Sequence, residues 1–245
     1  MNDPRIADVI DDILKTNDGR KSDVARGLLF NDQVPFVEEV INTTQGPTHD
    51  SYQVKVEAVY DIERPGNNFK GPVTNHKLLF HGTPKENVYY MLRDGFKKAI
   101  LSEKSPFGKG YYFTTCASKA LNFTNSKAKD APEQADEGEI SPPEGVQYLF
   151  LTEVALGKSK DMTKPERTVS KFMQDATSVY GKGIHRPTEK FEYPGDVPIE
   201  VGMELRKDEA TSSSFQYDEY VVFNAEQCRH KYLVKVTVVP KNIAL

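Results

Sequence analysis

Residues 78–84 constrain the fold of this chain more than any other segment, because a short apolar run stops there in polar and turn-forming residues. Residues 78–80 are Leu, Leu and Phe, a continuous apolar run that is typical of a strand buried on both faces. His81 and Gly82 follow at once, and Pro84 fixes a turn. Such a strand end presents an imidazole that exchanges a proton near pH 7 and a backbone without a Cβ, which a flat ligand can approach closely.

Two later segments share this design of an apolar strand with a polar or aromatic end. Residues 108–113 read Gly-Lys-Gly-Tyr-Tyr-Phe, and residues 217–223 read Tyr-Asp-Glu-Tyr-Val-Val-Phe. Considered singly, His81, Tyr112 and Glu219 each have a plain structural interpretation as strand-end or packing residues. That the three segments meet in one nucleotide site is what a family resemblance, given below, implies for their combination.

Hydrophobic periodicity predicts an α+β fold with more strand than helix. Apolar residues at helical spacing predict helices, whereas alternating or continuous apolar runs predict strands. The expected helices cover residues 5–15, 34–43, 85–94 and 118–123, and the expected strands cover residues 52–62, 77–80, 147–157, 217–224 and 231–239. We expect the last two strands to be near neighbours.

The composition narrows the class of protein. The 245 residues suit one large domain, and 38% hydrophobic with 28% charged residues indicate a soluble globular protein. A net charge of −4 gives no long-range attraction to nucleic acid or to an anionic membrane, and no apolar run reaches the ~18 residues of a membrane span. The acidic N-terminus does not resemble a secretory signal, and two cysteines are too few for a disulfide framework or a zinc site. We expect an intracellular protein, of the nucleus or the cytoplasm, that binds no metal.

The common nucleotide-binding and hydrolase motifs are absent from the sequence. No GxGxxG follows a predicted strand, and GxxxxGK[ST], HExxH and GxSxG do not occur. The Gly-Lys-Gly of residues 108–110 has the wrong spacing for a phosphate loop, and no helix begins there. A surface or structural role is expected for the remaining histidines, which lack metal-ligand spacing: His49, His76, His185 and His230. A nucleotide site in this chain must therefore be built in another way.

Five segments, taken in order, resemble the catalytic domain of the poly(ADP-ribose) polymerases, the diphtheria-toxin-like ADP-ribosyltransferases. They are LLFHGT, FGKGYYFTTCASKALNF, YLFLTEVALGK, VYGKGI with a later DVP, and DEYVVFNAEQCRHKYLVKV, and the resemblance runs from residue 35 to residue 239. It implies the ADP-ribosyltransferase fold, with two packed, mostly antiparallel sheets and short flanking helices. Residues 47–245 would form the catalytic domain, and residues 1–46 a short helical segment left from a regulatory region.

The resemblance also implies the chemistry. The family uses NAD as co-substrate and transfers ADP-ribose with a His-Tyr-Glu triad, whose positions fall on His81, Tyr112 and Glu219. The cationic nicotinamide is a good leaving group, so one carboxylate suffices where most glycosidases use two. Glu219 would bind the nicotinamide ribose and stabilise the positive charge that develops as the bond stretches.

Further positions that match the family surround the same dinucleotide. His81 would hold the adenosine ribose, Gly82 would bind the carboxamide, and Tyr112 with Phe123 would enclose the nicotinamide ring. The remaining NAD-binding candidates are Thr83 and Asn87 on the adenine side, Lys97 toward the pyrophosphate, Lys119 for orientation, and Ser118.

Two departures from the family weaken this match. Ala120 stands where the family has a serine that binds the carboxamide, and Ser118 lies two residues too early to replace it. Phe123 replaces a tyrosine, which keeps stacking but loses a hydroxyl. We therefore expect weaker binding of NAD.

The leading interpretation is a poly(ADP-ribose) polymerase that modifies acceptor proteins, including itself, because Glu219 permits chain elongation. The alternatives are a mono-ADP-ribosyltransferase, a non-catalytic module that binds NAD or ADP-ribose, and a plain interaction domain.

Only about 45 residues precede the first predicted strand, whereas the family's large members carry an autoinhibitory helical subdomain there. We therefore expect activity that does not depend on DNA, with no nucleic-acid or membrane partner.

Overall fold

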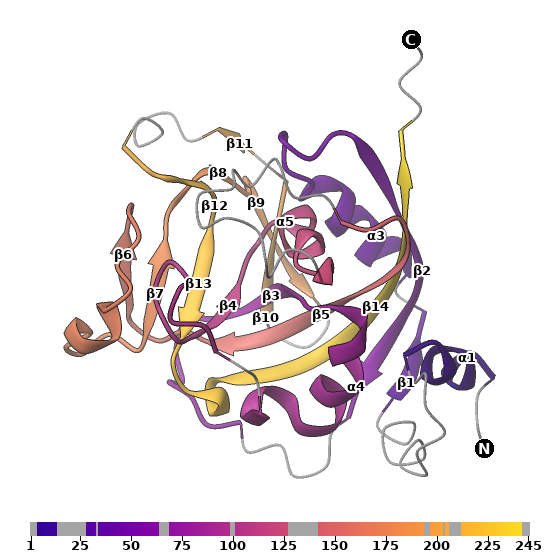
Figure 1. Cartoon of the computed structure of the whole chain (residues 1–245), viewed down its shortest axis with the longest axis horizontal. Coiled ribbons are helices and arrows are strands. Elements are labelled where there is room, and N and C mark those ends of the chain that lie inside the picture. Colours follow the sequence, from indigo (N-terminus) through magenta and orange to yellow (C-terminus); the bar gives the residue numbers. More distant parts are fainter. Residues whose placement is uncertain are drawn as a thin grey trace.

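The computed structural model describes residues 4–13, 28–32, 34–63, 69–98, 101–126, 142–193, 197–202, 204–205 and 212–241. Its largest sheet has five strands in the order β1-β2-β14-β5-β3, and every neighbouring pair is antiparallel (Figure 1). The strands are β1 (Leu28–Asn31), β2 (Tyr52–Ile62), β3 (His76–Gly82), β5 (Gly145–Ala155) and β14 (Cys228–Pro240).

Helices cover both faces of this sheet. Helices α1 (Pro4–Ile13) and α4 (Lys85–Asp94) pack on one face, and α3 (Val34–Thr43) and α5 (Ala117–Asn122) pack on the other (Figure 1). Leu79 belongs to the first core, whereas Leu78 and Phe80 belong to the second. Since successive side chains of a strand point to opposite faces, a strand buried on both sides needs a continuous apolar run, as residues 78–80 provide.

A second sheet carries the other two segments of interest. It has the order β4-β13-β7-β6, formed by β4 (Tyr111–Phe113), β13 (Glu219–Val222), β7 (Ser178–Gly181) and β6 (Ser159–Met162). Among the described residues, an isolated bridge between Phe80 and Thr114 joins it to the first sheet, with N···O distances of 2.9 and 3.1 Å. The end of β3 therefore lies beside β4, and β4 lies beside β13.

Two smaller sheets and three short 3₁₀ helices complete the described structure. One sheet has the order β11-β8-β12, with β8 (Gly183–Arg186), β11 (Glu204–Leu205) and β12 (Phe215–Tyr217), and the other pairs β9 (Glu189–Tyr193) with β10 (Val197–Val201). The 3₁₀ helices are η1 (Gly95–Lys98), η3 (Val169–Phe172) and η4 (Ala225–Gln227). Only the pairs β6–β7 and β8–β12 are parallel among the described strands.

The predicted α+β class and mostly antiparallel sheets are confirmed, and one expectation about strand neighbours is wrong. The two strands predicted to be near neighbours, residues 217–224 and 231–239, lie in different sheets. Strand β13 pairs with β4 and β7, whereas β14 pairs with β2 and β5. The turn at Asn224, whose side chain accepts a hydrogen bond from the Glu226 amide, and the following η4 carry the chain from one sheet to the other.

The boundary predicted between residues 46 and 47 stays a prediction. The structure adds that segments before it pack on the first sheet: α1 contributes Val9, Ile10 and Ile13 to one core, β1 extends the sheet, and α3 contributes to the other core. Among the described residues, no helix has the length and hydropathy that crossing a membrane requires.

Candidate active site

Strand β3 delivers His81 in a defined protonation state. Its Nδ1 lies 2.9 Å from the backbone oxygen of Tyr112, and because a carbonyl only accepts, Nδ1 must carry the proton. Burial lowers the pKa of His81 to about 4, against the opposing effect of this hydrogen bond. The ring also contacts Phe96 and Phe113 edge-on or tilted. At pH 7 the imidazole is therefore neutral, and its Nε2 presents a lone pair.

Gly82 brings the end of β3 into close contact with helix α5. A Cβ at this position would lie 1.7 Å from the carbonyl oxygen of Ala120. No residue other than glycine fits there without a movement of β3 or α5. The close approach fixes the helix that carries Lys119, Ala120 and Phe123 relative to the end of β3.

Strand β13 supplies a buried carboxylate beside β4. Val221 pairs with Tyr112, and Glu219 begins the same strand opposite Gly181. The Nζ of Lys119 donates to Oε1 of Glu219 at 2.6 Å, and their side chains are only 4% and 9% exposed. A cation at this distance favours the ionised carboxylate, so the pair places a fixed negative charge within the second sheet.

The hydroxyl of Tyr112 holds the turn that precedes its own strand. It donates to the carbonyl of Gly108 at 2.9 Å and accepts from the amide of Phe107 at 2.8 Å. Burial raises the pKa of Tyr112, and the charge of nearby Glu219 raises it further, although the Phe107 amide opposes both. The structure therefore brings His81, Tyr112 and Glu219 together: a hydrogen bond joins the first two, and an electrostatic interaction joins the last two.

Comparison with known proteins decides the family. A sequence profile described as the poly(ADP-ribose) polymerase catalytic domain matches residues 33–238, which is most of the chain. The chain belongs to the poly(ADP-ribose) polymerase catalytic domain family. It is 29% identical to poly(ADP-ribose) polymerase 1 of Arabidopsis thaliana over 217 residues, and 30% identical to that of Danio rerio.

These poly(ADP-ribose) polymerases are much longer than the present chain. The two matches cover 82% and 83% of this chain but only 20% and 19% of the relatives. A match to human poly(ADP-ribose) polymerase 2, at 25% identity, covers 82% of this chain and 33% of that relative. The chain therefore spans about a fifth to a third of the curated relatives that it matches here.

The other candidate residues of this poly(ADP-ribose) polymerase domain lie around the same strand end. Asn87 donates its side-chain amide to the hydroxyl of Thr83 at 3.2 Å, at the start of α4. Phe123 closes helix α5 with 51% of its surface exposed, so its ring is available for stacking. Lys97 lies in η1, but its side chain is outside the part of the chain that the structure describes.

Ser118 is directed elsewhere. Its Oγ accepts from the amide of Gly46 at 2.8 Å and lies 2.8 Å from Nδ1 of His49. This buried network ties α5 to the connection between α3 and β2, and His49 also lies 3.0 Å from the amide nitrogen of Asn122. The hydroxyl of Ser118 thus stabilises the position of the helix.

Sequence reasoning missed Asp218, which precedes Glu219 and is 2% exposed. Its carboxylate accepts from the Gly183 amide at 2.7 Å and from the Tyr180 hydroxyl at 2.8 Å. Its backbone carbonyl accepts from the hydroxyl of Thr114 at 2.7 Å. Adjacent acids at the start of an apolar strand were the available signal, because only one can face the site while the other must find partners elsewhere.

Across the described residues, no group of three or more histidine, cysteine or acidic side chains could hold a metal.

Proposed function

We propose that this chain is an NAD-dependent protein ADP-ribosyltransferase that transfers ADP-ribose to proteins, itself included, and to growing poly(ADP-ribose) chains. One observation carries the proposal. The buried Glu219 carboxylate, paired with Lys119 at 2.6 Å, lies in the sheet that the Phe80–Thr114 bridge joins to the end of β3, where His81 and Gly82 lie. Family membership supports the same activity, and the coverage of the relatives limits it to a proposal for this chain.

The reaction exchanges one bond at the anomeric carbon of the nicotinamide ribose. The bond from this carbon to nicotinamide breaks, and nicotinamide leaves as a neutral base with the bonding electrons. A nucleophilic atom of the acceptor then forms a new bond to the same carbon and releases its proton to water. The sugar carries positive charge between these events, so a preorganised carboxylate lowers the barrier without reorganising water.

The geometry suggests a role for each side chain. Glu219 would accept from a ribose hydroxyl and face the developing positive charge, while Lys119 keeps it ionised and fixed. The lone pair at Nε2 of His81 suits a hydroxyl of the other ribose, because Nδ1 is already bonded to Tyr112. The exposed ring of Phe123 suits stacking on nicotinamide, worth about 1 kcal/mol beyond area burial.

The length of the product is a separate question. A glutamate at position 219 favours elongation, since it can polarise the hydroxyl of an ADP-ribose acceptor as well as stabilise the donor. Ala120, which offers no hydroxyl to the carboxamide, favours the alternative of a weakly catalytic or purely NAD-binding domain. The loops expected to shape the acceptor side are residues 96–107 and 205–216, of which residues 99–100 and 206–211 lie outside the described part of the chain.

Labelled NAD incubated with the purified chain tests the proposal. We expect automodification, seen as reduced gel mobility and as added ADP-ribose units in mass spectrometry. Glu219→Gln should bind NAD but transfer no label, because the amide keeps a hydrogen-bond acceptor for Lys119 and loses the charge. Glu57→Gln, on β2 and away from the site, is the control and should transfer normally. Equal labelling by wild type and Glu219→Gln would show that another group is catalytic.

A further inference from the structure

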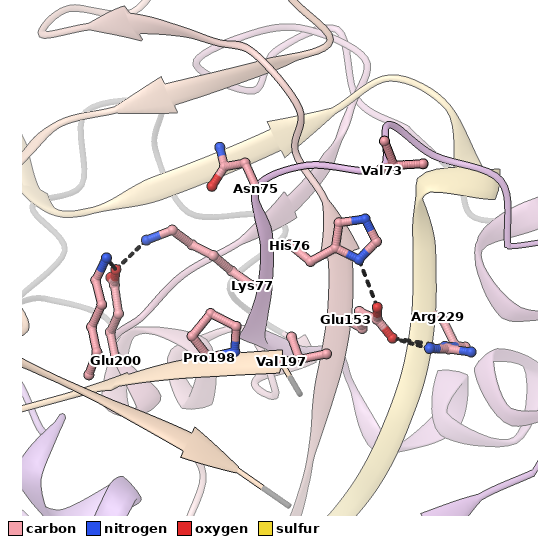
Figure 2. Close-up of a pocket in the computed structure, with 10 residues that line it drawn as sticks. Val73, Asn75, His76, Lys77, Glu153, Val197, Pro198, Glu200 and Arg229 are labelled. Atoms are coloured by element: carbon pink, nitrogen blue, oxygen red, sulfur yellow. Dashed lines mark hydrogen bonds and ion pairs between the residues drawn. The ribbon is translucent and has the colours of Figure 1, made fainter. Parts of the chain in front are cut away.

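A pocket of about 560 Å³ lies at the opposite end of β3 from His81 (Figure 2). The start of β3, the end of β5, the start of β14 and strands β9 and β10 line it. His81 lies five positions after His76, which corresponds to about 17 Å along a strand. The volume is within the usual range of small-molecule sites, and nothing in the proposed transfer reaction uses this pocket.

The first charged cluster of the pocket centres on a buried carboxylate. Glu153 is 4% exposed and lies between His76 and Arg229, as Figure 2 shows. Its Oε1 is 2.8 Å from Nδ1 of His76, and its Oε2 accepts from Nε of Arg229 at 2.9 Å. These two partners hold the pKa of Glu153 below its usual value although burial acts to raise it. Glu153 is therefore ionised.

The ring of His76 lies between two hydrogen-bond acceptors. Its Nδ1 faces the ionised Glu153, and its Nε2 lies 2.7 Å from the backbone oxygen of Pro72.

The second charged cluster lies across the pocket. Lys77 points to Glu200, with which it forms an ion pair, and the Nζ of Lys190 is 3.8 Å from the same carboxylate (Figure 2). The Lys190 side chain is 70% exposed, and that of Arg229 is 40% exposed with its guanidinium over the ring of Phe69 at 4.8 Å. Both cations can therefore reach a ligand without leaving their carboxylates.

Charge and shape together select the ligand. Among the described lining residues, three cations (Lys77, Lys190 and Arg229) face two carboxylates, Glu153 and Glu200. With histidine counted as neutral, this excess of one positive charge stands out in a chain whose net charge is −4. Val73, Val197 and Pro198 add apolar walls to the same pocket. A compact anion attached to a less polar group complements such a site, because Lys190 and Arg229 are exposed enough to contact it.

We propose that this pocket binds the pyrophosphate of an ADP-ribosyl group, and that the occupant is a unit of the chain that the active site extends. The pyrophosphate part of the proposal depends only on the pocket. The assignment to a growing chain depends on the proposed function, which would produce this anion at the protein itself. A second contact about 17 Å from His81 along β3 would retain a long product between additions.

Binding of a labelled ADP-ribose oligomer to the full chain, followed by fluorescence anisotropy, tests the proposal. Lys190→Glu turns the excess positive charge of the pocket into a negative one and should weaken binding about tenfold at low salt. Lys55→Glu is the matched control: its side chain is also 70% exposed, its Nζ lies 3.4 Å from Glu57, and it is on β2. The control should bind like wild type. Equal weakening by both variants, or none by Lys190→Glu, would overturn the proposal.

Two further measurements locate the site and its ligand. In NMR spectra, inorganic pyrophosphate should shift the ring signals of His76, and the same addition to Lys190→Glu should shift them less. Shifts of the His81 ring signals alone, or of neither ring, would refute the claim that pyrophosphate binds in this pocket. Monomeric ADP-ribose should bind more weakly than the oligomer. Equal affinities would assign the pocket to a free nucleotide and refute a growing poly(ADP-ribose) chain as its occupant.

Transfer activity separates this pocket from the active site. Lys190→Glu should still transfer the first ADP-ribose at the wild-type rate. A wild type without transferase activity would refute the proposed function but leave the pyrophosphate test intact.

Discussion

Replacing Gly82 with alanine tests the close contact on which the candidate site depends. The new Cβ would lie 1.7 Å from the Ala120 carbonyl oxygen, and this separation must roughly double to reach an ordinary contact. The obstacle is backbone, so no side chain can rotate away. Either the end of β3 or helix α5 must move, and α5 holds Lys119 against Glu219.

Two consequences of different size are expected. Overpacking of this kind costs about 1–3 kcal/mol of stability, which a typical domain tolerates. A displacement of about 1 Å at a reacting centre can lower a rate about 100-fold. Gly82→Ala should therefore remain folded, with urea denaturation showing a modest loss of stability, while kcat/KM for NAD falls by about two orders of magnitude.

Gly145→Ala separates these two effects. Gly145 has a φ of +84°, and no atom lies within 4 Å of the position that a Cβ would take, so alanine there strains the backbone without pushing on a neighbour. It should lose about 1 kcal/mol of stability and keep its transferase rate. A Gly82→Ala variant that retains more than a third of wild-type kcat/KM would refute the argument that this contact positions the site.

Three further predictions address single groups. Ala120→Ser should lower KM for NAD about two- to tenfold by adding one hydrogen bond to the carboxamide, and an unchanged KM in steady-state assays would contradict the placement of Ala120. Tyr112→Phe removes the bonds to Phe107 and Gly108, so hydrogen exchange in residues 105–110 should accelerate and kcat should fall; an unaltered exchange pattern would show that the hydroxyl does not hold this turn. Because the folded pKa of His81 is about 4, the unfolded chain binds a proton below pH 6.5 that the folded chain does not, and stability is lost as pH falls from about 6.5 to about 4. Compared with His81→Asn, wild type should lose at most about 2 kcal/mol more between pH 7 and pH 5 in urea titrations, and identical losses would argue against a neutral His81.

Local signals in the sequence predicted the helices and the central strands well. Helix α4 has the predicted bounds because Pro84 cannot continue a helix backward and Gly95 ends it, and both act within a few residues. The continuous apolar run of β5 was recognisable because both faces of this strand are buried. In contrast, apolar alternation reports that a strand is buried but not which strand lies next to it, and so β13 and β14 were wrongly expected to be neighbours.

Contacts between distant residues were not predictable from local patterns. Lys119 and Glu219 are 100 positions apart, and nothing near either residue specifies the other. The strand expected to begin at residue 108 begins at Tyr111, because Gly108 adopts a φ of +70° and the turn after it is held by Tyr112. The positions of the triad were accessible only through resemblance to a family, since each member has an ordinary structural interpretation by itself.

The Phe80–Thr114 bridge has a consequence for the order of folding. The imidazole belongs to one sheet, the carboxylate belongs to the other, and two backbone hydrogen bonds connect these sheets at the bridge. Strands β13 and β14 follow each other in sequence, yet one completes the second sheet and the other completes the first. A partly folded chain in which these two strands have not yet joined their sheets would thus hold no assembled triad.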